Sequence, residues 1–112
     1  MSAETTKNYN KLVRDKIPTI IESNGDMCKT KILSQEEYMA ELDKKLSEEL
    51  AEYQESKSLE ELADMLEVMI AIANSRGYDW SDVMVLRWQK RAERGGFDNK
   101  VFLEETWRDE KK

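Results

Sequence analysis

Apolar residues recur every three or four positions along three stretches of the chain, which short polar or glycine-containing segments separate. This spacing places them on one face of an α-helix, whereas strict alternation would indicate a strand. The pattern predicts a mainly α protein, a helical bundle with three main helices at about residues 35–55, 59–76 and 80–94. The second helix is apolar nearly all round, so we expect oligomerisation to complete the core.

Helix-start signals precede the first two of these helices. Ser34 and Ser58 are each followed three positions later by a glutamate, Glu37 and Glu61, which is the pattern of a capping box. Glycines follow the second and third helices, as is typical of helix C-termini. A short polar break separates the first two helices, and we expect them to form an antiparallel hairpin.

Smaller elements are predicted outside the bundle. Pro18 suits the first turn of a short N-terminal helix that ends at Asn24-Gly25. Residues 27–33 could form a strand that pairs with residues 101–103, giving a small two-stranded β pairing. Residues 1–8 are polar and expected to be disordered. We expect residues 9–107 to form a single all-α domain.

A glutamate falls on the apolar face of the first long helix. This face is formed by Tyr38, Leu42, Leu46, Leu50 and Tyr53. At about 100° per residue the stripe covers about 120°, and Glu49 lies inside it, roughly 20° from one edge. A carboxylate among core residues is destabilising unless positive charge lies beside it. Lys45, one turn earlier, could supply that charge, but it does not explain the other carboxylates nearby.

Two acidic pairs flank the break, Glu49-x-x-Glu52 before it and Glu61-x-x-Asp64 after it. Residues three apart share a helix face, so a hairpin would bring the four carboxylates together at two matching levels, Glu52 with Glu61 and Glu49 with Asp64. Such repelling charges are best tolerated around a cation, and the spacing therefore predicts a metal site. Glu61 could cap its helix, coordinate the metal, or do both. We expect Glu67, further along this helix, to face solvent, although it could lie at the edge of the site.

Composition narrows the chemistry. The 112 residues include 18 Lys and Arg against 24 Asp and Glu, a formal charge of -6, which argues against non-specific nucleic-acid binding. The absence of His excludes Ser-His, Cys-His and His-zinc chemistry. A single cysteine, Cys28, permits no internal disulfide and favours a cytoplasmic location. No apolar run is long enough to span a membrane. Catalysis would therefore depend on carboxylates, Lys, Arg or a metal.

Two groups of basic residues are candidates for anion binding. Lys11, Arg14 and Lys16 lie within six residues and could reach phosphate groups, although the same segment could simply dock on the core. On the third helix, four cations recur at spacings of three and four: Arg87, Lys90, Arg91 and Arg94. They could form a solvated basic face, or Lys90 and Arg94 could supply counter-charges to a polyphosphate.

Together these motifs resemble a known family. The two acidic pairs are similar to those of the MazG-like, all-α nucleoside triphosphate pyrophosphatase superfamily. The opening residues 9–18 (YNKLVRDKIP) and the closing residues 94–97 (RGGF) resemble its phosphoribosyl-ATP pyrophosphohydrolase-like, house-cleaning branch. The likeness covers residues 9–103, nearly the whole chain. It implies a dimer or higher homo-oligomer, and it leaves the substrate open between phosphoribosyl-ATP, a damaged nucleotide and an ordinary deoxynucleotide.

The resemblance implies a Mg²⁺-dependent enzyme that cleaves a nucleoside triphosphate between its α and β phosphates, giving a monophosphate and pyrophosphate. The matching metal ligands are Glu49, Glu52, Glu61 and Asp64. Ligands that are all oxygen favour Mg²⁺, or Mn²⁺, over zinc. Glu52 is our candidate general base. The triphosphate would be bound by Lys11, Arg14, Lys16, Lys90 and Arg94. The alternatives are a non-catalytic helical oligomerisation module and a nucleotide-binding sensor.

Overall fold

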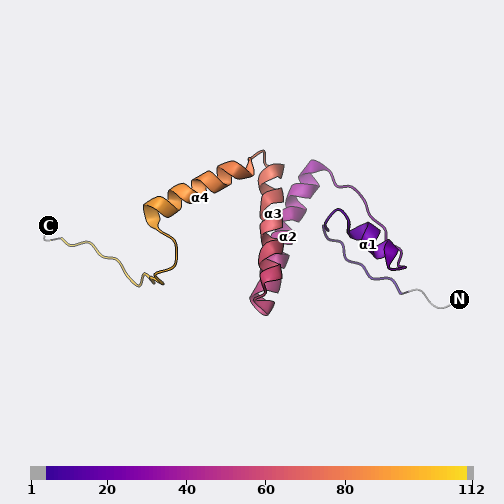
Figure 1. Ribbon diagram of the computed structural model, residues 1–112, viewed down its shortest axis with the longest axis horizontal. Helices are drawn as coiled ribbons and strands as arrows, with labels where there is room; N and C mark the ends of the chain where they lie inside the picture. The colour runs from indigo at the N-terminus through magenta and orange to yellow at the C-terminus, as the bar shows by residue number, and fades with distance from the viewer. Residues whose placement is uncertain (1–4, 111–112) are drawn as a thin grey trace. The chain divides into compact units, whose positions relative to one another are not determined.

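The computed structural model describes residues 5–110, and within them the chain is mainly helical and contains no strand. The four helices are α1 (Ile17–Ser23), α2 (Gln35–Ser56), α3 (Leu59–Ser75) and α4 (Trp80–Arg94) (Figure 1). The predicted fold class is confirmed, and the bounds of the three main helices agree with the prediction to within one residue. Across residues 5–110, no helix has both the length and the hydropathy that crossing a bilayer requires.

The chain divides into two compact units, Met1–Trp80 and Ser81–Lys112. The first unit contains α1, α2 and α3, and the second contains α4 beyond its first residue. The prediction of a single domain over residues 9–107 stays a prediction. The predicted disorder of residues 1–8 falls partly on residues 1–4, which lie outside the described residues; residues 5–8 have neither helix nor strand.

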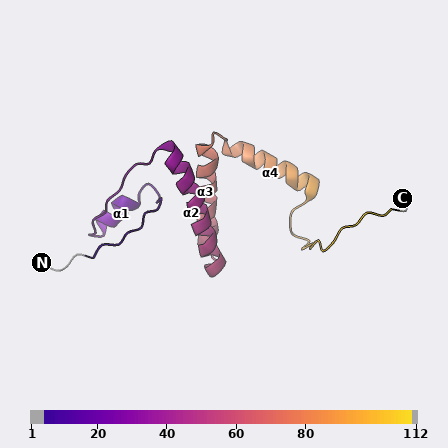
Figure 2. The same cartoon turned by 180° about the vertical axis from the view of Figure 1, so that it is seen from behind.

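Helices α2 and α3 form an antiparallel hairpin (Figures 1 and 2). Its turn is short because Lys57 adopts a left-handed conformation, with φ of 57°, and ends α2 at once. Its Nα donates a hydrogen bond of 2.7 Å to the carbonyl of Tyr53. Ser58 then accepts a hydrogen bond from the backbone N–H of Glu61 and starts α3.

Contacts at the open end of the hairpin fix its register. The side-chain amide of Gln35, at the start of α2, donates a hydrogen bond of 3.1 Å to the carbonyl of Ser75, at the end of α3. The Arg76 guanidinium lies 3.7 Å from the carboxylate of Asp43. Gly77, with φ of 82°, follows, so the helix ends where the glycine pattern predicts.

The core of the hairpin is thin. Among the described residues, the buried apolar side chains are Leu42 on α2 and Val68 and Ala73 on α3. Other apolar side chains of α3 remain exposed: Leu59, Leu62, Leu66 and Met69. The expected cover from a second copy stays a prediction.

The short N-terminal helix is present, but the predicted β pairing is wrong. Pro18 lies in the first turn of α1, and the helix ends before Gly25 with φ of 93°. Residues 27–33 and 101–103 are irregular, and Ile32 and Phe102 are almost fully exposed. A strand is stable only when a neighbour takes its backbone hydrogen bonds, and within residues 5–110 neither segment has such a neighbour.

In the second unit, α4 ends at Gly95, whose Nα donates a hydrogen bond of 2.8 Å to the carbonyl of Arg91. Gly95 has φ of 84°, which a residue with a Cβ adopts only with strain. Arg91 and Arg94 lie in the last turn, where positive charge opposes the negative end of the helix dipole. The Arg91 guanidinium also lies 3.4 Å from the carboxylate of Asp98.

Candidate metal centre

Three carboxylates converge between α2 and α3 near the closed end of the hairpin. Glu49 on α2 and Glu61 and Asp64 on α3 each present an oxygen, and these oxygens all lie within 4.8 Å of one another. We refer to these three residues as the acidic cluster. Glu49 and Asp64 were predicted to lie at one level of the hairpin, and the structure brings them together. It adds Glu61 because residues three apart share a helix face.

Among the described residues, Glu49 is the charged residue that is buried, with 6% of its surface exposed. Its Oε1 lies 3.3 Å from Nζ of Lys45, the counter-charge that the sequence indicates. Its Oε2 is buried and has no hydrogen-bond partner. A buried carboxylate oxygen without a partner is destabilising by about 1–3 kcal/mol or more, since it loses its hydration and gains nothing in exchange. Lys45 therefore compensates Oε1 of Glu49 but leaves Oε2 without a partner.

The contacts of Glu61 differ from those of a complete capping box. Its backbone N–H donates to Oγ of Ser58, as in a capping box. The reciprocal bond is missing, because the backbone N–H of Ser58 donates to Oγ of Ser56 instead. The Glu61 side chain turns towards α2, where its Oε2 is buried without a partner. Burial, followed by the approach of the Glu49 and Glu52 carboxyl groups, raises the pKa of Glu61 to about 7.

Glu52 and Glu67 lie outside the acidic cluster. Glu52 is exposed, one turn closer to the hairpin turn than Glu49, yet near enough to Glu61 to help raise its pKa. This position, beside the cluster and open to water, is compatible with the predicted role of a base. Glu67 is exposed, and it is not part of the cluster, as expected for a residue that faces solvent.

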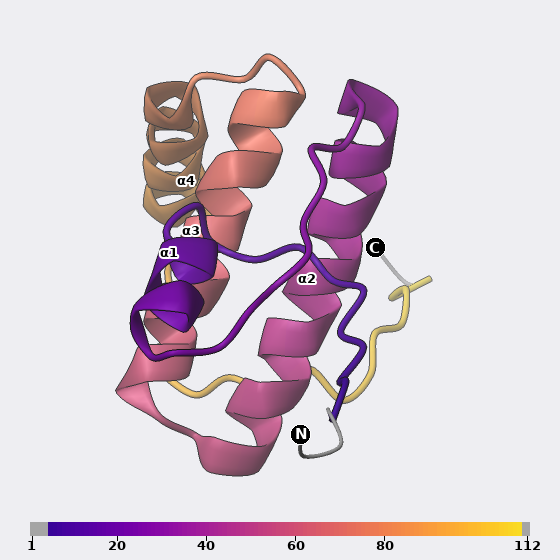
Figure 3. The same ribbon diagram turned by 90° about the vertical axis from the view of Figure 1, so that its right-hand side faces the viewer.

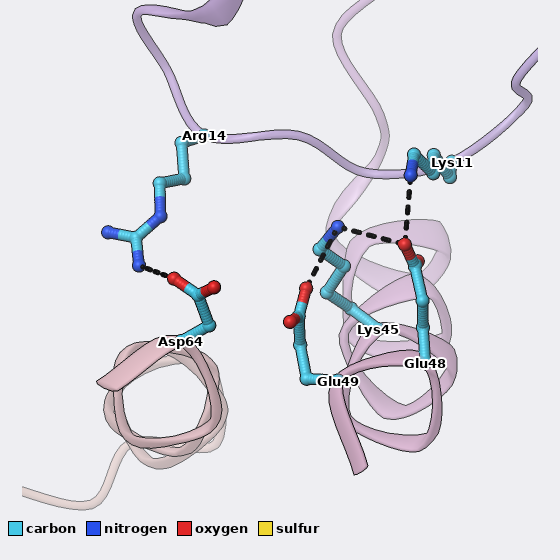
Figure 4. A network of polar contacts seen from close by, with 6 residues as sticks. All are labelled: Lys11, Arg14, Lys45, Glu48, Glu49 and Asp64. Atoms are coloured by element: carbon cyan, nitrogen blue, oxygen red, sulfur yellow. Dashed lines mark hydrogen bonds and ion pairs between the residues drawn. The ribbon is translucent and has the colours of Figure 1, made fainter. Parts of the chain in front are cut away.

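An irregular N-terminal segment, residues 10–16, crosses the hairpin (Figure 3), on the side towards which Glu49 and Asp64 point (Figure 4). We call it the N-terminal strap. Arg14 Nη2 lies 2.7 Å from Oδ1 of Asp64 on α3, and Lys11 Nζ lies 2.8 Å from Oε1 of Glu48 on α2 (Figure 4). The two side chains thus anchor the strap to both helices of the hairpin.

Glu48 is the residue of this network that the sequence patterns did not indicate. Its Oε1 is shared between Lys11 and Lys45, at 2.8 and 3.5 Å (Figure 4). The hydrogen bond from Lys11 lowers the pKa of Glu48, and the same bond raises the pKa of Lys11. The only sequence signal was its position three residues after Lys45, a spacing common on solvated helix faces. Its partner on the strap is 37 residues away in sequence.

The cluster fits a hard divalent cation. Its donor set consists of carboxylate oxygens alone, the ligands that Mg²⁺ and Mn²⁺ prefer. Two of its residues also have a buried oxygen without a hydrogen-bond partner, Oε2 of Glu49 and Oε2 of Glu61. Desolvated acceptors that face each other repel, and a cation among them would remove both the repulsion and the unsatisfied groups. Glu49, Glu61 and Asp64 are therefore the residues that could hold it.

The remaining candidate anion-binding residues are not part of this network. Lys16 is exposed at the end of the strap, just before α1. Lys90 and Arg94 are exposed on α4, in the second unit. Their predicted role in binding phosphate stays a prediction.

The chain was also compared with known proteins. No family model, no curated protein and no solved structure matches it.

Proposed function

We propose that the protein is a Mg²⁺-dependent nucleoside triphosphate pyrophosphohydrolase of the MazG-like type, acting in the cytoplasm. The observation that carries the proposal is the acidic cluster, in which a buried Glu49 and a half-buried Glu61 each keep an oxygen without a partner. The resemblance of the acidic pairs, of residues 9–18 and of residues 94–97 to that superfamily supports the same activity.

The chain's own residues have distinct roles in this proposal. Glu49, Glu61 and Asp64 hold the cation, which when bound would neutralise charge on the phosphate oxygens. Glu52 accepts a proton from the water that attacks the α-phosphorus. The α–β anhydride bond breaks, which releases pyrophosphate and gives a nucleoside monophosphate. Lys11, Arg14 and Lys16 bind the phosphate groups.

We further propose that the active protein is a homodimer or a higher homo-oligomer. Leu59, Leu62, Leu66 and Met69 follow one another at spacings of three, four and three residues, so they form one exposed apolar stripe along α3. Such a stripe is the seam by which helices associate. An oligomerisation module without catalysis would share this stripe but would not need the acidic cluster.

The test is pyrophosphate release from standard and modified nucleoside triphosphates and phosphoribosyl-ATP, with and without Mg²⁺. Glu49→Gln and Asp64→Asn each remove a cluster carboxylate and should lower Mg²⁺-dependent release about a hundredfold or more, because the cation loses a charged ligand. Glu60→Gln is the matched control, since Glu60 is exposed in the same helical turn as Glu61. It should leave release near the wild-type rate.

Thermal melting in the same buffers separates the alternatives. Saturating Mg²⁺ should stabilise the wild-type protein through mass action, by about 2.7 kcal/mol at a hundred times its Kd. Full activity in both cluster variants would rule out the proposed site. Nucleotide binding without pyrophosphate release would instead indicate a sensor. A melting temperature that neither Mg²⁺ nor nucleotide changes would indicate an oligomerisation module.

A further inference from the structure

Two ion pairs connect the N-terminal strap to the hairpin. Across residues 10–16, the hydrogen bonds and ion pairs that reach α2 or α3 are those of Lys11 with Glu48 and Arg14 with Asp64, while Leu12 between them is half-buried. Both pairs are open to water, with 40% of the Lys11 side chain and 56% of the Arg14 side chain exposed. Ion pairs in water contribute little to stability. The Arg14 pair can therefore be broken at small cost.

One of these pairs involves a residue of the acidic cluster. Oδ1 of Asp64 accepts from the Arg14 guanidinium at 2.7 Å, and Asp64 also contributes an oxygen to the cluster, whose oxygens all lie within 4.8 Å of one another. A cation held by Asp64 therefore competes with Arg14 for the negative charge of this carboxylate. It also places a divalent charge a few ångströms from the guanidinium, which it repels.

A small pocket lies where the strap meets α2. Its volume is about 80 Å³, and it is lined by Asn10, Lys11 and Leu12 of the strap and by Lys45 and Glu48 among others of the helix. No residue of the acidic cluster lines it. Sites for small molecules measure roughly 300–1,000 Å³, so a nucleotide would enter this pocket only if the strap moved.

We infer that the N-terminal strap is a cation-controlled latch. A divalent cation bound by Glu49, Glu61 and Asp64 releases Arg14 from Asp64 and makes its guanidinium available to a phosphate group. The inference rests on the proposed metal site and adds an order of events to it. The Asp64 carboxylate pairs with Arg14 until a cation binds there, so phosphate is bound after the cation.

The test is calorimetric titration of the full-length protein with Mn²⁺ alone, with no anion ligand present. Arg14→Gln removes the competing guanidinium and should tighten Mn²⁺ binding roughly three- to tenfold, the range expected for an exposed ion pair plus the loss of like-charge repulsion. Arg76→Gln is the matched control, because Arg76 pairs with Asp43 at the other end of the hairpin. It should leave Mn²⁺ affinity within about twofold of wild type.

A second variant and a second measurement test the inference even if Arg14→Gln does not fold. Arg14→Lys keeps the charge but loses the planar fork, so its affinity should lie between those of wild type and Arg14→Gln. Trypsin cleavage after Arg14 requires this side chain to leave Asp64, so Mn²⁺ should accelerate cleavage within residues 10–16 of the wild-type protein several-fold.

The outcomes distinguish this inference from the proposed function. Weaker or unchanged Mn²⁺ binding in a folded Arg14→Gln protein would show that Arg14 positions Asp64 or is a bystander, and it would overturn the latch while leaving the metal site intact. Absence of Mn²⁺ binding in the wild-type protein would overturn the metal site, and the latch with it.

Discussion

The first turns of α2 and α3 have the same sequence pattern, a serine followed three positions later by a glutamate, and they differ in what the glutamate does. At the start of α2, Glu37 closes a complete capping box: its Oε1 accepts from the backbone N–H of Ser34 at 3.1 Å, and its own N–H donates to Oγ of Ser34. At the start of α3, Glu61 donates its backbone N–H to Ser58, but its carboxylate does not return the bond.

The two carboxyl groups also titrate in opposite directions. Hydrogen bonds from Ser34 lower the pKa of Glu37, whereas burial and two neighbouring carboxyl groups raise the pKa of Glu61 to about 7. Both glutamates belong to an N-terminal helical turn, where the dipole favours negative charge. The surroundings therefore outweigh the local motif. The exposed Glu37 completes its capping box, whereas the Glu61 carboxylate, which faces a neighbouring helix, does not.

The largest difference between the two turns should appear in activity. Glu61→Gln removes a charged ligand from the acidic cluster and should reduce Mg²⁺-dependent pyrophosphate release about a hundredfold or more. Glu37→Gln makes the same substitution in the other box and should leave the rate near that of wild type. Steady-state assays at saturating Mg²⁺ measure both. Equal losses in the two variants would mean that Glu61 matters only through the helix start.

Stability should show a smaller contrast. Ser34→Ala removes the bond that Oγ accepts from the backbone N–H of Glu37 but keeps the backbone N–H that donates to the Glu37 carboxylate, so it should lower the free energy of unfolding by about 0.5–1 kcal/mol. Ser58→Ala removes two accepted bonds, from the backbone N–H of Glu61 and from Oγ of Ser56, and should cost about 1–2 kcal/mol. Urea denaturation of metal-free protein gives both values. If Ser34→Ala proved the more damaging, the carboxylate half of the α2 capping box would have to depend on the serine side chain.

The smallest contrast is expected in the pH dependence of metal-free stability, because both groups lie in first helical turns near solvent. Glu61 binds its proton more tightly in the folded state, so stability should fall as pH rises from about 4.5 to about 7. Glu37 has a lowered pKa, so its contribution is present above 4.5 and is lost as pH falls through that lower pKa.

Chemical denaturation in EDTA at a series of pH values follows both slopes. Glu61→Gln should flatten the decline between pH 4.5 and 7 and leave the acid side unchanged, and Glu37→Gln should do the opposite. A wild-type stability that rises with pH between 4.5 and 7 would contradict the raised pKa of Glu61.

Local patterns predicted most of the fold. Ser34, Ser58, Gly77 and Gly95 stop and start helices through bonds within a few residues, so the helix bounds follow from sequence. The β pairing was wrong because a strand depends on a partner far along the chain, and residues 27–33 have none within the described chain. For the candidate site, spacing indicated Glu49, Glu61 and Asp64, and Lys45 as the charge beside Glu49.

The sequence by itself determined where helices begin and end and which carboxylates could meet, because both depend on bonds and spacings within one or two helical turns. The tertiary structure alone decided that the Glu61 carboxylate takes no part in the cap, that Glu52 stays outside the cluster, and that the strap pairs Arg14 with Asp64. The Arg14 pair joins residues 50 positions apart. No periodicity encodes such a contact, since it depends on how a segment without regular structure crosses two packed helices.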